Sequence, residues 1–262
     1  MSTNTRSPLK DKPLRLPGQS LDEERRKLFE DKLEMPVLAA LLIASMTAME
    51  WWRYYAKQPP SPKLLSVVAL AFVAFAAWRF WRIVPRLRAL RQGMEGERAV
   101  GQFLERLRES GYHVFHDVIG TDFNIDHVLI GPAGVFTIET KTWSKPLKGE
   151  ARVICEGDSL RVGALKPDRN PIIQAKAQAA WLKQLLSAST GKAYTARAVL
   201  LFPGWYVEQG RGTTREVWVL EPKALPAFLG KEPTVLEKEN IALASFHLSR
   251  FVREEERRRA AL

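Results

Sequence analysis

Cysteine is almost absent from this chain of 262 residues, which contains Cys155 alone. One cysteine excludes a disulfide framework and argues against a cysteine-ligated zinc site. The four histidines, at positions 113, 116, 127 and 247, lack the spacing of a familiar metal-binding motif. The sequence also lacks an internal repeat and a Walker A pattern, so we expect neither a solenoid nor a built-in nucleotide-driven motor.

Positive charge is in excess but unevenly distributed along the chain. The formal net charge is +11, and residues 1–92 contribute 16 Lys and Arg against 8 Asp and Glu. Residues 93–262 contribute 24 against 21, a balance of only +3. The basic excess therefore surrounds the N-terminal part, a distribution that favours a membrane surface over a domain that coats nucleic acid.

Two apolar runs, residues 35–52 and 64–84, approach the length of about 20 residues that a helix needs to cross a bilayer. We expect two transmembrane helices at about 36–55 and 64–84, within a membrane segment 35–85. Tryptophans and tyrosines close both runs, as in the headgroup belt of membrane proteins. A buried hairpin of a soluble protein is the alternative, but neither run shows the polar face of a soluble helix. A cleaved signal peptide is disfavoured because a long charged stretch precedes the first run.

The charges that flank the two runs predict their orientation. The connector between the runs holds three basic residues, whereas the two outer flanks hold many more. The positive-inside tendency then places both termini in the cytoplasm. We expect a bacterial inner-membrane protein with a polar cytoplasmic tail, residues 1–34, that contains a short charged helix.

From residue 94 the pattern changes to that of an α/β domain. Residues 95–110 and 170–187 have helical periodicity, and Asn170-Pro171 is a good helix start. Strands are predicted at 112–118, 124–130, 135–141, 195–202 and 216–220, with a short hairpin over 151–162. We predict one α/β domain over 93–222 and a C-terminal helical extension over 223–262.

The turn at residues 131–134 fixes which side chains of the flanking strands oppose one another. If Ile130 faces Val135, then Asp126 faces Glu139, with Cβ atoms about 5 Å apart. Side chains alternate along a strand, so Lys141 shares the face of Glu139. Two opposed carboxylates repel, and a divalent cation such as Mg²⁺ or Mn²⁺ removes that penalty. The alternative is a solvated strand face with an incidental ion pair, but the neighbouring strand residues are apolar.

Three further polar residues are expected to point into the interior. Glu97 lies on the core-facing stripe of its predicted helix, where a carboxylate needs a partner. Gln174 and Gln178 lie one turn apart, in line with the apolar face of their helix. Taken with the strand cluster, they indicate a functional site.

The order of these residues resembles a known family. Glu97 lies in GMEGE, Asp126 in NIDHV and Glu139 and Lys141 in GVFTIETK, and Asn170-Pro171 precedes Gln174 and Gln178. This set is similar to the nuclease-related domain, NERD, a branch of the PD-(D/E)XK nuclease superfamily, over residues 93–202. The resemblance implies a restriction-endonuclease-like α/β (α+β) core with a central mixed sheet flanked by helices. It implies Asp126 and Glu139 as metal ligands, Lys141 as the catalytic lysine and Glu97 with Gln174 or Gln178 as supporting residues.

Three functions compete at this point. A membrane-anchored, Mg²⁺- or Mn²⁺-dependent nuclease, acting on DNA in preference to RNA, is favoured by the intact Asp, Glu and Lys. A non-catalytic nucleic-acid-binding module on the same fold is the second reading. A membrane scaffold that binds protein is the third, because the balance of +3 over residues 93–262 is modest for a non-specific DNA binder.

Overall fold

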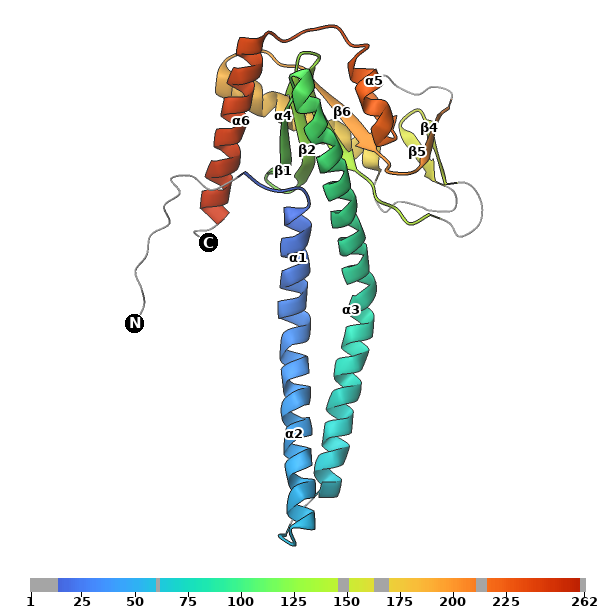
Figure 1. Ribbon diagram of the computed structural model, residues 1–262, viewed down its shortest axis with the longest axis vertical. Helices are drawn as coiled ribbons and strands as arrows, with labels where there is room; N and C mark the ends of the chain where they lie inside the picture. Colours follow the sequence, from blue (N-terminus) through green and yellow to red (C-terminus); the bar gives the residue numbers. More distant parts are fainter. Residues whose placement is uncertain (1–13, 60–61, 146–150, 163–169, 211–215, 260–262) are drawn as a thin grey trace. The chain divides into compact units, whose positions relative to one another are not determined.

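The computed structural model describes residues 14–59, 62–145, 151–162, 170–210 and 216–259. The chain divides into two compact units. Ser20–Gln92 form a helical hairpin, and Gly93–Leu262 together with the residues up to Gln19 form a globular unit (Figure 1).

The first arm of the hairpin is helical from its start. Helix α1 (Gln19–Phe29) continues through a π-helical turn, η1 (Glu30–Glu34), into α2 (Met35–Tyr55). Pro36 lacks the N–H that would bond four residues back, and a π-helical turn directly before it accommodates this loss. The short charged helix expected within the tail 1–34 is observed as α1 and η1, and residues 20–34 belong to the same compact unit as the apolar helices.

The second arm is one helix, α3 (Pro62–Glu105), of 44 residues. It contains both the expected span at 64–84 and most of the expected helix 95–110, with Pro85 inside it. Helix α3 continues past Pro85 and Gly93, which lie between these segments, and leads into the short 3₁₀ helix η2 (Arg106–Ser110). Gly111 caps η2 in the left-handed region, which glycine adopts readily.

Both arms are long and apolar enough to cross a membrane, and their apolar windows are only 6% and 0% buried. Leu41 and Leu70, for example, are 63% and 71% exposed. The buried soluble hairpin considered from the sequence is therefore not the structure observed. Polar contacts join the arms, since the Trp51 indole donates to Ser66 Oγ at 3.1 Å and the Arg86 guanidinium pairs with Glu24 at 2.5 Å.

The globular unit is built on a mixed five-stranded sheet with the order β1-β2-β3-β6-β8. Strands β1 (His113–Ile119), β2 (Asn124–Gly131) and β3 (Gly134–Thr140) form an antiparallel meander. Strands β6 (Ala196–Leu201) and β8 (Val217–Leu220) then continue the sheet in parallel with β3. A small second sheet contains β4 (Arg152–Glu156), β5 (Ser159–Val162) and β7 (Tyr206–Gln209), of which β7 was not predicted.

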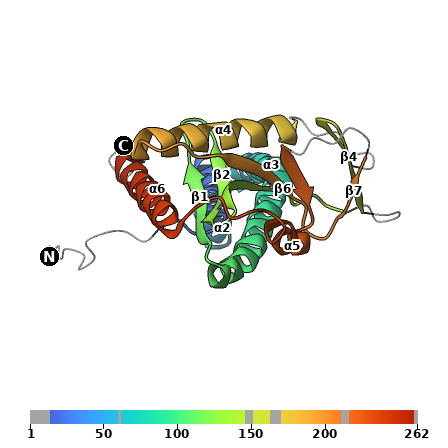
Figure 2. The same ribbon diagram turned by 90° about the horizontal axis from the view of Figure 1, so that it is seen from above.

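Helices cover both faces of the main sheet. On one face the C-terminal part of α3 packs with α5 (Leu225–Leu229), which follows the short helix η3 (Pro222–Ala224). On the other face lie α4 (Pro171–Thr190) and α6 (Lys238–Arg259), and Figure 2 shows α4 running across the strands. The fold is thus a mixed α/β architecture with a central mixed sheet flanked by helices.

Helix α6 shares the core of the domain that precedes it. Its apolar stripe of Ile241, Ala244, Leu248 and Val252 packs into one buried cluster with β1, β2 and α4. Residues 223–262 therefore belong to the same compact unit as residues 93–222, and the boundary predicted at 222 does not divide the structure. The stripe recurs at helical spacing because it covers a sheet face that would otherwise be exposed.

Candidate functional site

The β2–β3 turn has the predicted register. Ile130 pairs with Val135, and the ladder continues to the pair His127–Ile138. Asp126 and Glu139 are the next positions outward. Here the ladder gives way to a side-chain contact, because Asp126 Oδ2 accepts a hydrogen bond of 2.6 Å from the backbone N–H of Thr140. The turn thus brings Asp126 to the strand end that carries Glu139 and Lys141.

Glu139 is buried and is bound by three donors. Lys141 Nζ lies 2.6 Å from Oε1, and Gln174 Nε2 donates to the same oxygen at 3.0 Å. Gln178 Nε2 donates to Oε2 at 2.7 Å and also to the Asn124 carbonyl at 2.8 Å. With 5% of Glu139 exposed, these contacts fix the orientation of its carboxylate.

Helix α4 positions the two glutamines. The Asn170 side chain caps its start by accepting from the N–H of Ile172 at 2.9 Å, and Pro171 occupies the first turn, as the sequence predicted. Gln174 and Gln178 then follow one turn apart on the face toward Glu139. The expectation that they point into the interior is confirmed by these contacts and by the 1% exposure of Gln178.

Helix α3 brings Glu97 to the same site through a close approach at Gly96. A Cβ on Gly96 would lie 1.8 Å from Oγ1 of Thr142, the residue after Lys141, so only glycine allows this packing. Glu97 is 8% exposed. Burial, then the negative charges of Asp117 and Glu139, raise the pKa of Glu97 to about 8, against a hydrogen bond from the Gly18 backbone and the charge of Lys141.

Asp126 is also affected by the neighbouring carboxylates. Its desolvation, followed by repulsion from Glu139 and Glu97, raises the pKa of its carboxyl well above the ordinary value. Asp126 is nevertheless half-buried, so its side chain reaches the surface of the site. Three carboxylates and one lysine therefore share a small space in which negative charge is undercompensated.

This donor set fits a hard divalent cation bound with water and substrate oxygens. Among the described residues, no group of three or more His, Cys, Asp or Glu side chains is arranged to hold a metal ion by itself. Mg²⁺ commonly binds through one or two carboxylates plus water and phosphate oxygens, so it does not need such a closed cage. Asp126 and Glu139 provide two carboxylates, and a bound cation would offset the repulsion between their negative charges.

A buried ion pair beside the site was not found from the sequence. Arg15 Nε donates to Asp117 Oδ2 at 2.8 Å, with 3% and 2% of the two side chains exposed, and Arg15 also pairs with Glu256. Asp117 has a φ of 50°, which is unusual for a residue other than glycine. Pro17, two residues after Arg15, packs closely against Gly101 of α3. A Cβ added to Gly101 would lie only 2.7 Å from Cγ of Pro17. The segment at residues 14–18 is therefore part of the globular unit.

The histidines take no part in this cluster. His127 Nδ1 lies 2.9 Å from His116 Nδ1, and His116 Nε2 lies 2.9 Å from Glu105 of α3, away from Glu139. Burial lowers the pKa of His116 and lowers that of His127 well below its usual value.

Two tryptophans follow strands near the site, Trp143 after β3 and Trp205 after β6. Trp205 is 3% exposed and donates to the Trp143 carbonyl at 3.3 Å, so it is a core residue. Trp143 lies 5.2 Å from the Phe202 ring and is half-buried. Lys148 and Arg211, which are basic residues near these tryptophans in the sequence, lie outside the described residues.

Comparison with known proteins agrees with this geometry. Residues 92–203 match the family model of the nuclease-related domain, NERD, which belongs to the PD-(D/E)XK-like nuclease superfamily. The resemblance stated from the sequence is confirmed.

Relatives add little beyond the family. An uncharacterized protein of Bacillus anthracis is 33% identical over 66 residues, which cover 23% of this chain and 31% of that protein. The match thus spans about a third of the relative's length. No solved structure matches the chain.

Proposed function

We propose that the chain is a membrane-anchored nuclease that hydrolyses nucleic-acid phosphodiester bonds with the help of Mg²⁺ or Mn²⁺, with DNA ahead of RNA as substrate. One observation carries the proposal. The buried carboxylate of Glu139 is oriented by Lys141, Gln174 and Gln178 beside two further carboxylates of raised pKa. A merely structural strand end has no need of this accumulation of charge.

The residues take the following roles in the proposed reaction. Asp126 and Glu139 would hold the cation, which supplies an activated water and neutralises charge on the phosphoryl oxygens. Lys141, whose Nζ already lies 2.6 Å from Glu139, is placed to orient the attacking water or to stabilise the developing negative charge. Gln174 and Gln178 keep the Glu139 carboxylate in one orientation. Glu97 adds a third carboxylate beside Asp126 and Glu139.

The fold order supports the same proposal. Within the globular unit the end of α3, the meander β1-β2-β3, α4 and β6 follow one another as a restriction-endonuclease-like core requires. The site lies where β3 ends and α4 crosses it. Fold alone does not establish chemistry, so the assignment depends on the residues at that place.

The experiment that tests the proposal is cleavage of labelled DNA and RNA by the purified full chain in detergent, with Mg²⁺ or Mn²⁺ and with EDTA. We expect cation-dependent cleavage, faster on DNA. If neither nucleic acid is cut but DNA binds with a strong salt dependence, the chain is a binding module. If DNA is not bound even at low salt, the scaffold reading replaces the proposal.

Membrane anchoring rests on α2 and on the first half of α3. Their exposed apolar side chains need a non-aqueous surrounding, and the basic flanks favour an arrangement with both termini and the globular unit in the cytoplasm of a bacterial inner membrane. A reporter that is active only in the cytoplasm, fused after Leu262, is expected to be active. Activity only of a reporter that requires export would refute this orientation.

Glu97 gives a test of the charge cluster that does not depend on substrate. Its folded pKa of about 8 lies above the unfolded value of 4.5, so its stabilising contribution is full below about pH 4.5 and is lost as the pH rises toward 8. Glu97→Gln should therefore stabilise the metal-free protein at pH 8 by a few kcal/mol, on the order given by one pKa unit per 1.4 kcal/mol. The difference should vanish near pH 4.5.

Thermal unfolding of both proteins across this pH range measures the effect. Addition of Mn²⁺ at pH 8 should stabilise the wild type, because a bound cation compensates the ionised carboxylates. A stability difference that does not depend on pH would show that Glu97 is not held in the charge cluster.

A further inference from the structure

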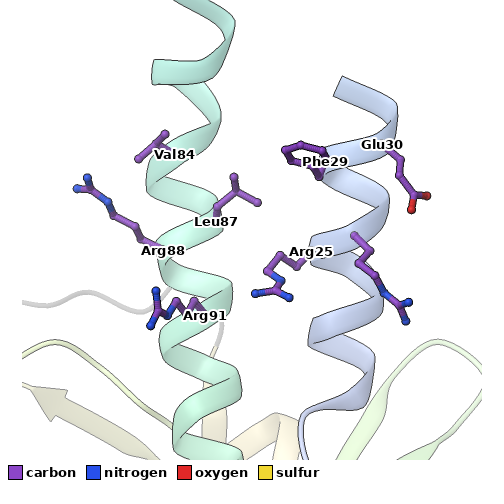
Figure 3. Close-up of a pocket in the computed structure, with 8 residues that line it drawn as sticks. Arg25, Phe29, Glu30, Val84, Leu87, Arg88 and Arg91 are labelled. Atoms are coloured by element: carbon purple, nitrogen blue, oxygen red, sulfur yellow. The ribbon is translucent and has the colours of Figure 1, made fainter. Parts of the chain in front are cut away.

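A basic groove lies between the two arms of the hairpin, wholly within the unit Ser20–Gln92. Its volume is about 480 Å³, within the usual size of a small-molecule site. Residues of α1 and η1 form one wall and residues of α3 form the other (Figure 3). Four of the eight lining residues are arginines, and Glu30 is the one acidic residue among them.

The groove lies just beyond the apolar runs. The first run begins at Met35, and the second ends near Val84. Because the two arms are joined at the opposite end, the segments 25–30 and 84–91 lie at the same end of the hairpin, the end at which both flanks leave it. The ion pair of 2.5 Å between Arg86 and Glu24 joins the arms at this level. In a membrane-spanning hairpin, this level is that of the lipid headgroups.

The apolar residues of the groove begin nearer the apolar runs than its arginines do, and Arg88 lies level with Leu87 (Figure 3). Phe29, Val84 and Leu87 lie toward the apolar runs, whereas Arg25 and Arg91 lie about one to two turns farther away (Figure 3). Phe29 is 52% exposed although it lies beside this groove. The order from apolar to basic matches the order from acyl chain and glycerol to phosphate in a phospholipid.

Two of the arginines that line the groove, Arg25 and Arg88, are exposed to a ligand. Arg25 pairs with Asp22 at 2.7 Å but keeps 40% of its side chain exposed. Arg88 is exposed, and in the part of the chain that the structure describes it has no ion pair. Two arginines on facing helices, above an apolar wall, suit the fork-like recognition of a phosphate group.

We propose that this groove binds one anionic phospholipid of the cytoplasmic leaflet, with its phosphate on Arg25, Arg88 and Arg91 and its glycerol region against Phe29, Val84 and Leu87. The site rests on the proposed membrane anchoring. It differs from diffuse attraction of a basic flank to an anionic surface, because it depends on the arginines that line the groove and not on all cations at that level.

The chain provides a matched pair of variants for the test. Arg25→Gln with Arg88→Gln removes two charges that line the groove. Lys27→Gln with Arg86→Gln removes two charges from the same helices at the same level, but these residues do not line the groove. Each pair loses one cation with a described acidic partner, since Arg25 pairs with Asp22 and Arg86 pairs with Glu24.

The measurement is the selectivity of the full chain for spin-labelled phosphatidylglycerol over spin-labelled phosphatidylcholine, in vesicles of phosphatidylcholine with a minor fraction of phosphatidylglycerol. The groove variant should lose selectivity by about fivefold for each arginine removed, and the control variant should keep most of it. Equal losses in both variants, or no loss in either, would overturn the proposed site.

Two further experiments separate the alternatives. Glycerol phosphate or a DNA oligonucleotide that displaced phosphatidylglycerol from the wild type would assign the groove to a soluble ligand and overturn the lipid proposal. Alkaline extraction of the vesicles tests the anchor itself. A wild type released by alkali would refute the anchoring and the lipid site with it, whereas a retained protein without groove-dependent selectivity would refute the lipid site alone.

Discussion

Glu139→Gln is expected to lower the rate of metal-dependent cleavage by more than about 100-fold, because even residues that only orient a metal ligand cost about 10- to 100-fold when replaced. The substitution keeps the size of the side chain but removes the charge that would bind the cation. It also places an amide opposite the donors Lys141, Gln174 and Gln178, whose hydrogen bonds of 2.6 to 3.0 Å need an acceptor. Cleavage and Mn²⁺ affinity should therefore fall together.

Lys141→Met separates the effect on cleavage from the effect on Mn²⁺ affinity and is compared with Glu139→Gln. It removes the ammonium group but leaves Asp126 and Glu139 intact, so Mn²⁺ should bind at least as tightly while the cleavage rate falls by about 100-fold or more. Mn²⁺ binding is followed by the loss of its free electron-spin resonance signal, and the cleavage rate by single-turnover assays. A Lys141→Met protein with wild-type cleavage would remove Lys141 from the proposed chemistry.

Arg15→Met is expected to destabilise the globular unit by about 3–5 kcal/mol, because it removes the cation that is ion-paired with a buried carboxylate. Asp117 is 2% exposed, and Arg15 pairs with it at 2.8 Å. For a unit of this size the loss corresponds to a fall of roughly 6–20 °C in the unfolding temperature. Arg250→Met is the control, since its pair with Glu254 is 66% and 46% exposed and should contribute less than about 1 kcal/mol.

Thermal unfolding of the full chain in detergent measures both variants. Arg15→Met with Asp117→Asn should recover part of the loss, because the buried negative charge of Asp117 is then also removed. Equal unfolding temperatures for Arg15→Met and Arg250→Met would show that the segment at residues 14–18 does not stabilise the globular unit. A fragment that begins at residue 93 lacks Arg15, so tests of activity should use the full chain.

The central cluster could be predicted because local rules fix it. A four-residue turn sets the register of two strands, and alternation then places Asp126, Glu139 and Lys141 at one strand end. Helical periodicity likewise predicted that Gln174 and Gln178 point inward. In the structure both side-chain amides donate hydrogen bonds to the Glu139 carboxylate. These inferences need only the nearest neighbours in sequence.

The missed features depend on distant contacts. Arg15 and Asp117 are 102 residues apart, and no periodic pattern links them. Strand β7 has four residues, Tyr-Val-Glu-Gln, without apolar alternation, and it forms because β4 offers it an edge. Helix α3 runs through Pro85 because its flanking residues favour helix, whereas a proline alone predicts a kink or an end.

The dependence of the cleavage rate on metal concentration tests the proposed metal site at Asp126 and Glu139 most directly. Mn²⁺ is titrated into metal-free full-length wild type and Asp126→Asn with a labelled DNA substrate. We predict that the wild-type rate rises from near zero to saturation and that Asp126→Asn needs at least about tenfold more Mn²⁺ for half-saturation, because one of two carboxylate ligands is neutral. Cleavage that persists in EDTA, or equal titration curves for the two proteins, would contradict a metal-dependent site at Asp126 and Glu139.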